Sequence, residues 1–303
     1  MSTSTLDDPE TLAATPPFRT ISRSRRIKDR TATVLVSIAF LIAVVPLIWL
    51  GVTVIARGAA ALGSAGWWLQ SQAGVLPDEL AGGVYHAIYG TLIQALLCAL
   101  IAVPIGIMAA IYLVEYGRGR LARTTSFMVD ILSGVPSIVA ALFIFALFIS
   151  ILGLEQSAFM VSLGLVLLML PIVVRNTEEM LRLVPDELRE AAYALGVPKW
   201  KTILRVVLPT ALSGTVTGVM LALARVMGET APVLVLVGYA RAINFDPFEG
   251  NMASLPLLVY TELTNPEAGG QFRVWGAALT LIIIIMILQV GASVISRFSA
   301  IQK

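Results

Sequence analysis

The sequence predicts an all-α protein that crosses a membrane several times, and three observations lead to this fold class. Hydrophobic residues make up 57% of the 303 residues and charged residues 13%, and the mean hydropathy is +0.87. The apolar residues gather in six long runs that are almost free of charge. Lysine and arginine are sorted between alternate connections of those runs. A water-soluble fold cannot bury so large an apolar fraction, and a net charge of +2 gives no reason to expect nucleic acid as a partner.

Each of the six apolar runs is interpreted as a membrane-spanning helix. A hydrocarbon core about 30 Å thick takes roughly 20 residues of helix. The runs cover residues 31–56, 84–114, 127–152, 157–174, 210–238 and 274–295. The fourth run is the shortest, which a tilted neighbour or a locally thinner bilayer would accommodate. Pro104, Pro136 and Pro171 fall in the second, third and fourth runs, where we expect them to bend or end the helices.

The basic residues predict the orientation of these spans. Of the 21 lysines and arginines, only Arg57, Arg225, Arg241 and Arg273 lie outside the two terminal tails and the second and fourth connections. Basic residues resist translocation and collect on the cytoplasmic side, so we expect both tails and these two connections to be cytoplasmic. An odd number of spans would break the alternation. The sequence therefore predicts six spans with the N-terminus and the C-terminus inside.

The first 30 residues are predicted to form a disordered cytoplasmic tail ahead of a membrane domain over residues 31–303. The tail carries Pro16-Pro17 among many serines and threonines, a composition that does not support a packed core. Arg25-Arg26 ahead of an apolar run also resembles a twin-arginine export signal. The run is about 23 residues long, whereas a signal core has about 7 to 15. We therefore assign it to a first span with a basic anchor.

The connection between the fourth and fifth runs is predicted to form two short helices. Asp186 and Glu190 lie near the start of the first helix, where they suit the positive end of its dipole. Gly196 stops this helix as a C′ glycine would. Pro198 suits the first turn of the second helix, and Pro209 is expected to end or kink that helix where the chain re-enters the membrane.

One face of the first short helix carries small side chains. Ala191, Ala192 and Ala194 would let the backbone of another protein approach closely, which predicts a docking surface. The alternative is an amphipathic helix that lies on the membrane, with its leucines and Trp200 at the level of the headgroups. These physical features alone do not separate the two interpretations.

The fifth apolar run contains two charged residues, Arg225 and Glu229. A charged side chain at mid-bilayer costs at least about 2.5 kcal/mol, so the pair needs a reason. Their spacing places both on one helix face, where they can pair. One interpretation is a structural ion pair that holds this helix against a neighbour. The other is a pathway site for an anion, with Thr230 beside it, in which the guanidinium binds an oxyanion and Glu229 keeps the binding from becoming too tight.

Residues 190–209 resemble the EAA motif of bacterial ABC importer permeases, which has the form EAA-x3-G-x9-I-x-LP. The matching residues are Glu190, Ala191, Ala192, Gly196, Val206, Leu208 and Pro209. The single departure is valine in place of isoleucine at position 206, which keeps a β-branched apolar side chain. The resemblance implies the type I ABC importer permease fold. It also implies that the loop over residues 176–209 contains a coupling helix that sits in a groove of a separate ATPase subunit.

The resemblance narrows over residues 132–234 to the phosphate-specific transport (Pst) importers. The sequence Gly-Glu-Thr-Ala-Pro over residues 228–232 is similar to the A-type sister of the two permeases in that family, whereas the C-type tends to read Gly-Glu-Thr-Met-Ala. Residues 133–138, Ser-Gly-Val-Pro-Ser-Ile, fit the same group. The resemblance implies a permease of the bacterial plasma membrane that translocates inorganic phosphate.

The same resemblance implies partners and the place of the cofactor. Importers of this family combine the A-type permease with a C-type permease, two cytoplasmic ATPase subunits and an extracytoplasmic phosphate-binding protein, within membrane lipid. The sequence has no Gly-x4-Gly-Lys-Ser/Thr phosphate loop. ATP and magnesium are therefore expected on the ATPase subunits, and no cofactor or metal is expected in this chain.

Other classes of function stay open at this point. A stand-alone secondary carrier would use Arg225 and Glu229 for ion coupling, and an ABC permease for another oxyanion would share the EAA motif. An intramembrane enzyme is disfavoured, because the sequence has one histidine, one cysteine and no Gly-x-Ser-x-Gly. We therefore expect no catalytic residue, and we expect the histidine, His86, at the membrane interface.

Overall fold

The computed structural model describes residues 22–301, and the side chains of residues 22–294. Every regular element among these residues is a helix, which agrees with the predicted all-α class. The chain divides into two units, Met1–Thr53 and Val54–Lys303. Five of the described helices are long and apolar enough to cross a membrane, and a bent pair of helices is a sixth candidate.

Helix α1 (Arg23–Leu62) contains the first predicted span and continues through Pro46. Because α1 begins at Arg23, residues 23–30 are helical, although their composition placed them in the predicted tail. The rest of that tail, residues 1–21, lies outside the described residues. Most of α1 belongs to the first unit, and its last turns belong to the second unit.

Four long helices form the framework of the second unit and correspond to the predicted spans two, four, five and six. They are α3 (Tyr85–Ile111), α6 (Ala158–Arg182), α9 (Leu208–Met227) and α12 (Ala268–Ile301). Helix α6 extends well past residue 174, so its length alone is sufficient to span a bilayer without thinning. Helices α3 and α6 continue through Pro104 and Pro171, so neither proline ends its helix.

The third predicted span is a bent pair rather than one straight helix. Helix α4 (Gly119–Ser133) and helix α5 (Ser137–Ile144), which a π-helical segment extends to Ile151, are bent by 107° at the break between them. Pro136 lies at this break in an extended conformation, with φ −60° and ψ 140°. Proline has no N–H to donate and disfavours helical backbone in the residue before it. The expected effect of Pro136 is thus confirmed.

The fifth predicted span is interrupted. Helix α9 ends at Met227, and a short helix, α10 (Ala231–Leu236), begins after a linker of three residues. The run over residues 210–238 gives little sign of this break, because the residues on both sides of it are hydrophobic. The predicted single helix through Glu229 is therefore wrong.

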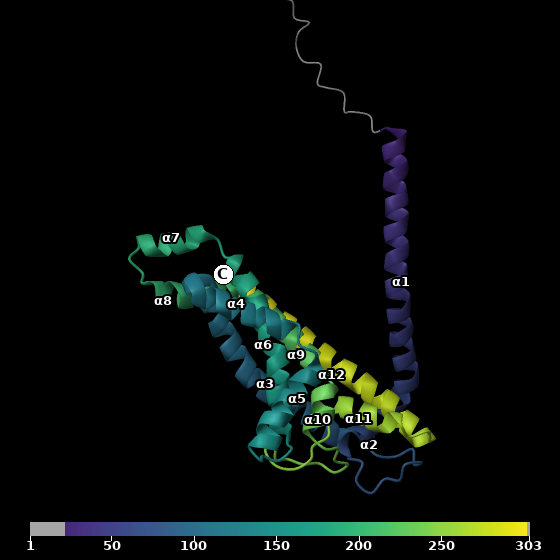
Figure 1. The fold of residues 1–303 in the computed structure, drawn as a ribbon. Coiled ribbons are helices and arrows are strands. Elements are labelled where there is room, and N and C mark those ends of the chain that lie inside the picture. Colours follow the sequence, from purple (N-terminus) through teal and green to yellow (C-terminus); the bar gives the residue numbers. More distant parts are fainter. Residues whose placement is uncertain (1–21, 302–303) are drawn as a thin grey trace, which may run out of the picture. The chain divides into compact units, whose positions relative to one another are not determined.

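Short helices close the two ends of the second unit. Helix α2 (Ala65–Leu69) and helix α11 (Leu255–Leu263) were not expected from the count of spans. They lie with α10 at one end of the unit, called the α11 end below. Helices α7 (Asp186–Ala194) and α8 (Lys199–Thr202) lie at the opposite end (Figure 1).

Helix α6 packs against α3 and α9 through glycines that allow close approach. A Cβ atom on Gly106 of α3 would lie 2.7 Å from Cγ1 of Val173, and one on Gly218 of α9 would lie 1.7 Å from Oδ1 of Asn176. Both distances are far inside van der Waals contact. Gly214, one turn earlier on α9, also lies close to α6, since a Cβ there would be 2.2 Å from Sδ of Met180. The Gly214-x3-Gly218 spacing therefore marks the face of α9 that packs on α6.

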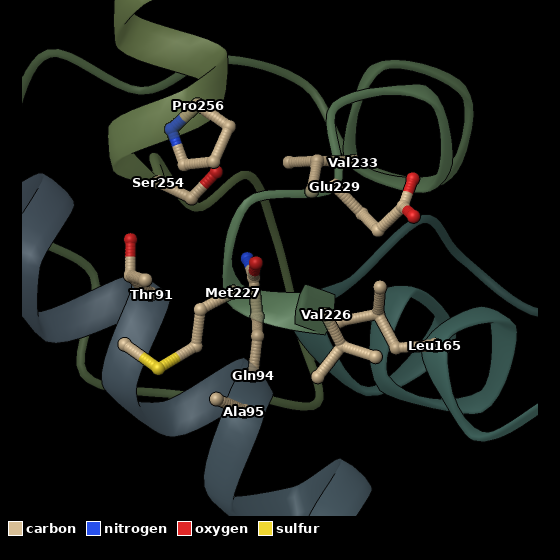
Figure 2. Close-up of a pocket in the computed structure, with 10 residues that line it drawn as sticks. All are labelled: Thr91, Gln94, Ala95, Leu165, Val226, Met227, Glu229, Val233, Ser254 and Pro256. Carbon is tan, nitrogen blue, oxygen red and sulfur yellow. The ribbon is translucent and has the colours of Figure 1, made fainter. Parts of the chain in front are cut away.

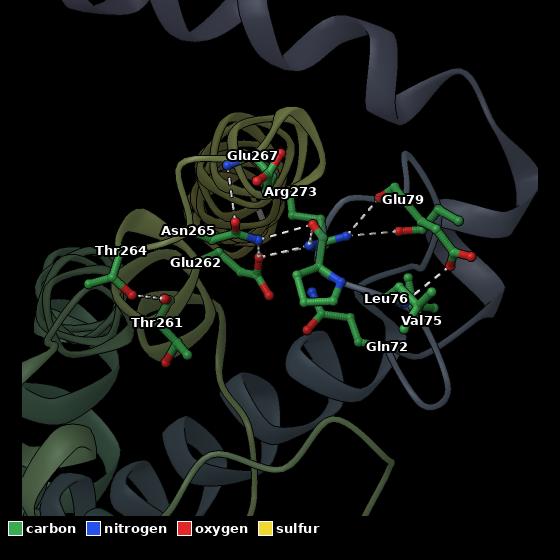
Figure 3. Close-up of polar contacts among 12 residues, drawn as sticks. Gln72, Val75, Leu76, Glu79, Thr261, Glu262, Thr264, Asn265, Glu267 and Arg273 are labelled. Carbon is green, nitrogen blue, oxygen red and sulfur yellow. Dashed lines mark hydrogen bonds and ion pairs between the residues drawn. The ribbon is translucent and has the colours of Figure 1, made fainter.

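A buried ion pair joins α11 and α12. The side chains of Arg273 and Glu262 are 3% and 4% exposed, and Nη2 of Arg273 lies 3.0 Å from Oε2 of Glu262. The guanidinium of Arg273 also donates to the carbonyl oxygens of Pro77 at 2.8 Å and Glu79 at 2.9 Å. Figure 3 shows Arg273 among these polar contacts. Arg273 precedes the predicted sixth span, but α12 begins at Ala268. The guanidinium of Arg273 thus belongs to α12 and is paired with Glu262 and two carbonyl oxygens.

The single histidine and the single cysteine are both buried. His86 is the second residue of α3 and is 1% exposed, so it faces other parts of the chain at this end of the helix. Its Nε2 lies 3.4 Å from the hydroxyl of Tyr239, which donates to Oε1 of Gln72 at 2.5 Å. Burial raises the pKa of Tyr239, so this hydroxyl stays protonated and available as a donor. Cys98 of α3 is fully buried, with its Sγ 3.6 Å from Sδ of Met169 on α6.

Candidate functional site

The segment that joins α6 to α9, residues 183–207, forms two helices as predicted and is called the α7–α8 loop. Helix α7 starts with Asp186 and Glu187 in its first turn and ends at Ala194. Gly196 follows with φ +74°, the left-handed conformation expected of a C′ glycine. A Cβ at Gly196 would meet no described atom within 4 Å. Backbone conformation, and not lack of space, therefore favours glycine here.

The α7–α8 loop exposes both polar and large apolar side chains. Glu190 and Ala191 are exposed, whereas Ala192 is 7% exposed and packs inward. The small-residue face is therefore narrower than the sequence suggested. Leu195 is 84% exposed and Trp200 59% exposed, with Leu188 and Tyr193 also exposed. Such a cluster of exposed apolar side chains favours contact with a partner or with the headgroup region of a membrane.

The end of the motif lies where the chain enters α9. Val206 belongs to a π-helical segment, Ile203–Val207, and Leu208 and Pro209 form the first turn of α9. Pro209 was expected to end or kink the helix. It does not end it, because the chain from Lys199 to Met227 stays helical, but the helical geometry changes from π to α directly before it. The missing N–H of a proline is best tolerated in the first turn of a helix, and a π-helical turn absorbs the irregularity ahead of it.

The three predicted pathway residues lie at the break between α9 and α10. Arg225 is in the last turn of α9, whereas Glu229 and Thr230 lie in the linker before α10. Nε of Arg225 and Oε1 of Glu229 are 4.0 Å apart, and their side chains are 66% and 19% exposed. This is a loose contact rather than a hydrogen-bonded pair, so a mainly structural ion pair is not supported within this chain.

Glu229 lines a small cavity beside the break. The cavity has about 10 Å³ accessible to the centre of a water molecule, and its other lining residues are Thr91, Gln94, Ala95, Leu165, Val226, Met227, Val233, Ser254 and Pro256. Figure 2 shows Gln94 extending from α3 toward the chain between α9 and α10, with the carboxylate of Glu229 on the other side of the cavity. A space of this size holds about one water molecule, so it is too small for an oxyanion in this conformation.

Gln94 is a polar residue of the site that sequence reasoning missed. Gln94 is 2% exposed, and its Nε2 has no hydrogen-bond partner among the described residues. A buried amide without a partner costs about 1–3 kcal/mol, so it is expected to pair with water or with a passing ligand. Thr91, by contrast, donates to Ala87 and accepts from the N–H of Leu255. Two polar residues one helical turn apart in an otherwise apolar run were the available signal.

Comparison with known proteins identifies relatives over nearly the whole chain. A family model described as "Binding-protein-dependent transport system inner membrane component" matches residues 102–300. The chain is 64% identical over 285 residues to "Phosphate transport system permease protein PstA" of Mycobacterium leprae, which covers 94% of this chain and 93% of the relative. It is 63% identical over 286 residues to "Phosphate transport system permease protein PstA 1" of Mycobacterium tuberculosis (strain CDC 1551 / Oshkosh), which covers 94% of each.

The fold also resembles that of solved transporters. A bacterial alginate ABC transporter, in complex with a periplasmic protein bound to an alginate pentasaccharide, matches with a TM-score of 0.60 at 14% identity. The match covers 90% of this chain and 95% of that chain. At this identity the likeness concerns the fold alone. The expected type I ABC importer permease fold is thereby confirmed.

Membrane-length helices, an exposed two-helix loop at one end and a broken helix beside a polar cavity define a multi-pass membrane permease subunit. The chain belongs to the binding-protein-dependent transport system inner membrane component family, and within it to the PstA-type permeases. Members of this family are inner membrane components and not enzymes, so the predicted location and the absence of a catalytic role follow from membership.

Proposed function

We propose that this chain is the A-type permease subunit of an ATP-driven importer that moves inorganic phosphate across the plasma membrane. The observation that supports this most is the identity of 63–64% to PstA permeases, over 94% of the chain. An identity this high over most of the chain supports the same substrate class as these relatives. Resemblance, rather than any single side chain, thus supports phosphate as the cargo.

The proposed complex contains three other kinds of subunit. This chain pairs with a C-type permease, two ATPase subunits bind ATP and magnesium, and an extracytoplasmic binding protein delivers phosphate. In the proposed orientation both termini and the α7–α8 loop face the cytoplasm. The sorting of lysine and arginine between connections supports this orientation.

The α7–α8 loop is the proposed contact with the ATPase. Its support is the spacing of Glu190, Ala191, Ala192 and Gly196 in the motif, together with the exposed side chains of Leu195 and Trp200. An apolar surface that remains exposed in the single subunit is suited to burial in a partner's groove. A helix lying on the membrane is the alternative for the same side chains.

Arg225, Glu229 and Thr230 are the proposed pathway residues. The guanidinium of Arg225 is 66% exposed at the surface of α9, so it is accessible to an anion or to the sister permease. Several N–H donors in one plane suit an oxyanion. Glu229, held only loosely by Arg225, offers a repulsive charge that limits how long the anion stays.

Uptake of radiolabelled phosphate into proteoliposomes that contain the full complex tests this function. We expect uptake that requires ATP, the binding protein and a functional ATPase, and that excess sulfate or molybdate does not suppress. A complex with an inactive ATPase subunit is the control. Uptake by this chain without ATPase would indicate a secondary carrier, and preferred uptake of another oxyanion would replace phosphate as the substrate.

A further inference from the structure

The end of α3 nearest the α7–α8 loop carries a buried carboxylate that the proposed function does not use. Helix α3 continues as a π-helical segment, Tyr112–Tyr116, which contains Glu115. The side chain of Glu115 is 5% exposed. A buried carboxylate needs a charged or hydrogen-bonding partner to offset its desolvation. That partner comes from α7.

Arg189 of α7 holds Glu115 with little freedom to move. Its Nε donates to Oε1 of Glu115 at 3.1 Å, and its side chain is 13% exposed. The two terminal nitrogens of Arg189 donate to the carbonyl oxygens of Val184 at 2.6 Å and Leu181 at 2.9 Å. Leu181 lies in the last turn of α6, and Val184 follows just after the helix. Arg189 also contacts Asp186 at 2.9 Å. One guanidinium thus joins α3, α6 and α7.

The other limb of the α7–α8 loop reaches the same point of α3. The ammonium group of Lys199, at the start of α8, donates to the carbonyl oxygen of Glu115. It also lies 4.7 Å from the centre of the Tyr116 ring, within the range of a cation–π interaction. Both limbs are therefore attached to the end of α3, one through the side chain of Glu115 and the other through its backbone.

Helix α3 leads from this attachment to the cavity at the break in α9. Gln94 lies 21 residues before Glu115, which is about 30 Å along a helix. Gly106 of α3, between these two residues, is in close contact with Val173 of α6. Because Gln94 and Glu115 lie on one continuous helical segment, a displacement of α3 along its own axis that α9 does not share would change the position of the Gln94 amide relative to Glu229.

We propose that Glu115 and Arg189 form the link through which α3 follows the α7–α8 loop. When the ATPase moves the loop, α3 moves with it and the Gln94 wall of the cavity shifts against Glu229. This inference rests on the proposed function, because it assumes an ATPase on the loop. Glu115 and Arg189 are positioning residues, since neither touches the cargo in this proposal.

The test uses the full complex in proteoliposomes and compares phosphate imported with ATP hydrolysed. We expect Glu115→Gln to leave assembly and ATP hydrolysis in place while import per ATP falls about tenfold. Arg189→Gln should lower import per ATP at least as much, because it also removes the donors to Val184 and Leu181. Adding Glu115→Gln to Arg189→Gln should lower the ratio no further, because one link is removed only once. Asp130→Asn is the matched control. It removes an exposed carboxylate that pairs with an arginine, Arg175, outside the α7–α8 loop, and should leave the ratio unchanged.

A second measurement does not depend on the cargo. In the wild-type complex, amide hydrogen exchange of the loop and of residues 112–116 should change together between the nucleotide-free and ATP-trapped states. In the Glu115→Gln complex, only the loop should change. The link would be overturned if the Glu115→Gln complex imported phosphate at the wild-type ratio to ATP hydrolysed. It would also be overturned if amide exchange at residues 112–116 of the wild type were the same in the nucleotide-free and ATP-trapped states. Failure of the wild type to import phosphate would instead refute the proposed function, because the exchange result stands without cargo.

Discussion

Arg225 is the residue at which the proposed anion pathway is most directly tested. Arg225→Gln removes the charge but keeps a planar polar group, so we expect phosphate uptake to be abolished while the complex still assembles. Arg225→Lys should retain partial uptake, because a single ammonium replaces several N–H donors in one plane. Uptake in proteoliposomes and size-exclusion chromatography of the complex are the measurements.

Arg123→Gln is the control for this substitution, since Arg123 is an exposed arginine of α4. Its uptake should match that of the wild type. If Arg225→Gln also transported normally, Arg225 would not belong to the pathway.

At the level of single residues, the sequence shows which side chains are charged or polar, but it does not show which residues they contact. The charges of Arg225 and Glu229 are conspicuous in an apolar run, but their loose 4.0 Å separation depends on a helix end that the composition does not reveal. Gln94 could not be assigned to the site from the sequence, because a single amide in a membrane span is not unusual. The absence of a hydrogen-bond partner for its Nε2 among the described residues is known only from the structure. The partner of Glu115 is 74 residues away in the chain, so only the tertiary fold brings it near.

Among the elements, the α7–α8 loop depends on the left-handed backbone of Gly196. Gly196→Val should strain this turn by about 1–2 kcal/mol, because a side chain is disfavoured at positive φ. We expect ATP hydrolysis to become uncoupled from uptake as the two short helices lose their relative orientation. The ratio of import to hydrolysis measures this.

Gly196→Asn should retain much of the coupling, since asparagine tolerates the left-handed region. Nucleotide-stimulated import at the wild-type ratio in Gly196→Val would contradict the role assigned to this turn.

The crossing of α6 and α9 is a second element-scale test. Gly218→Ala places a Cβ 1.7 Å from Oδ1 of Asn176, and overpacking of this kind costs about 1–3 kcal/mol. The thermal unfolding temperature of the purified complex should therefore fall. Gly291→Ala on α12 is the control, because a Cβ there meets no described atom within 4 Å. Equal unfolding temperatures for the two variants would show that the helices separate without cost.

For the whole molecule, the buried pair of Arg273 and Glu262 ties the α11 end together. Arg273→Met leaves the carboxylate of Glu262 buried without its partner, which typically destabilises a protein by about 3–5 kcal/mol. Combining Arg273→Met with Glu262→Leu should recover only part of the loss, because the carbonyl oxygen of Glu79 still lacks a donor. The carbonyl oxygen of Pro77 keeps the amide of Asn265 as a donor at 3.1 Å. Thermal unfolding of both variants gives the comparison. Full recovery would mean that the carbonyl contacts contribute nothing.

The overall architecture was predictable where the hydrophobic signal is continuous. Helices α3 and α12 follow from apolar runs of sufficient length, and Pro136 indicates the bend between α4 and α5. The start of α6 also follows from its apolar run, but its extension to Arg182 does not, because that part is polar. The break after Met227 could not be predicted from the sequence. Glycine, which follows at position 228, is common within membrane helices, and most residues beyond Thr230 are again apolar. Helix α11 did not follow either, because its short apolar sequence lies in a connection.

The burial of Cys98 makes the native chain suitable for mapping by thiol chemistry. The chain has a single cysteine, and that thiol is inaccessible between α3 and α6, so a cysteine added elsewhere would be the only reactive one. A membrane-impermeant maleimide should label Leu80→Cys, which is exposed at the α11 end, in intact cells. It should label Arg120→Cys, near the opposite end, only after the membrane is opened. The reverse pattern would invert the proposed orientation without altering any helix.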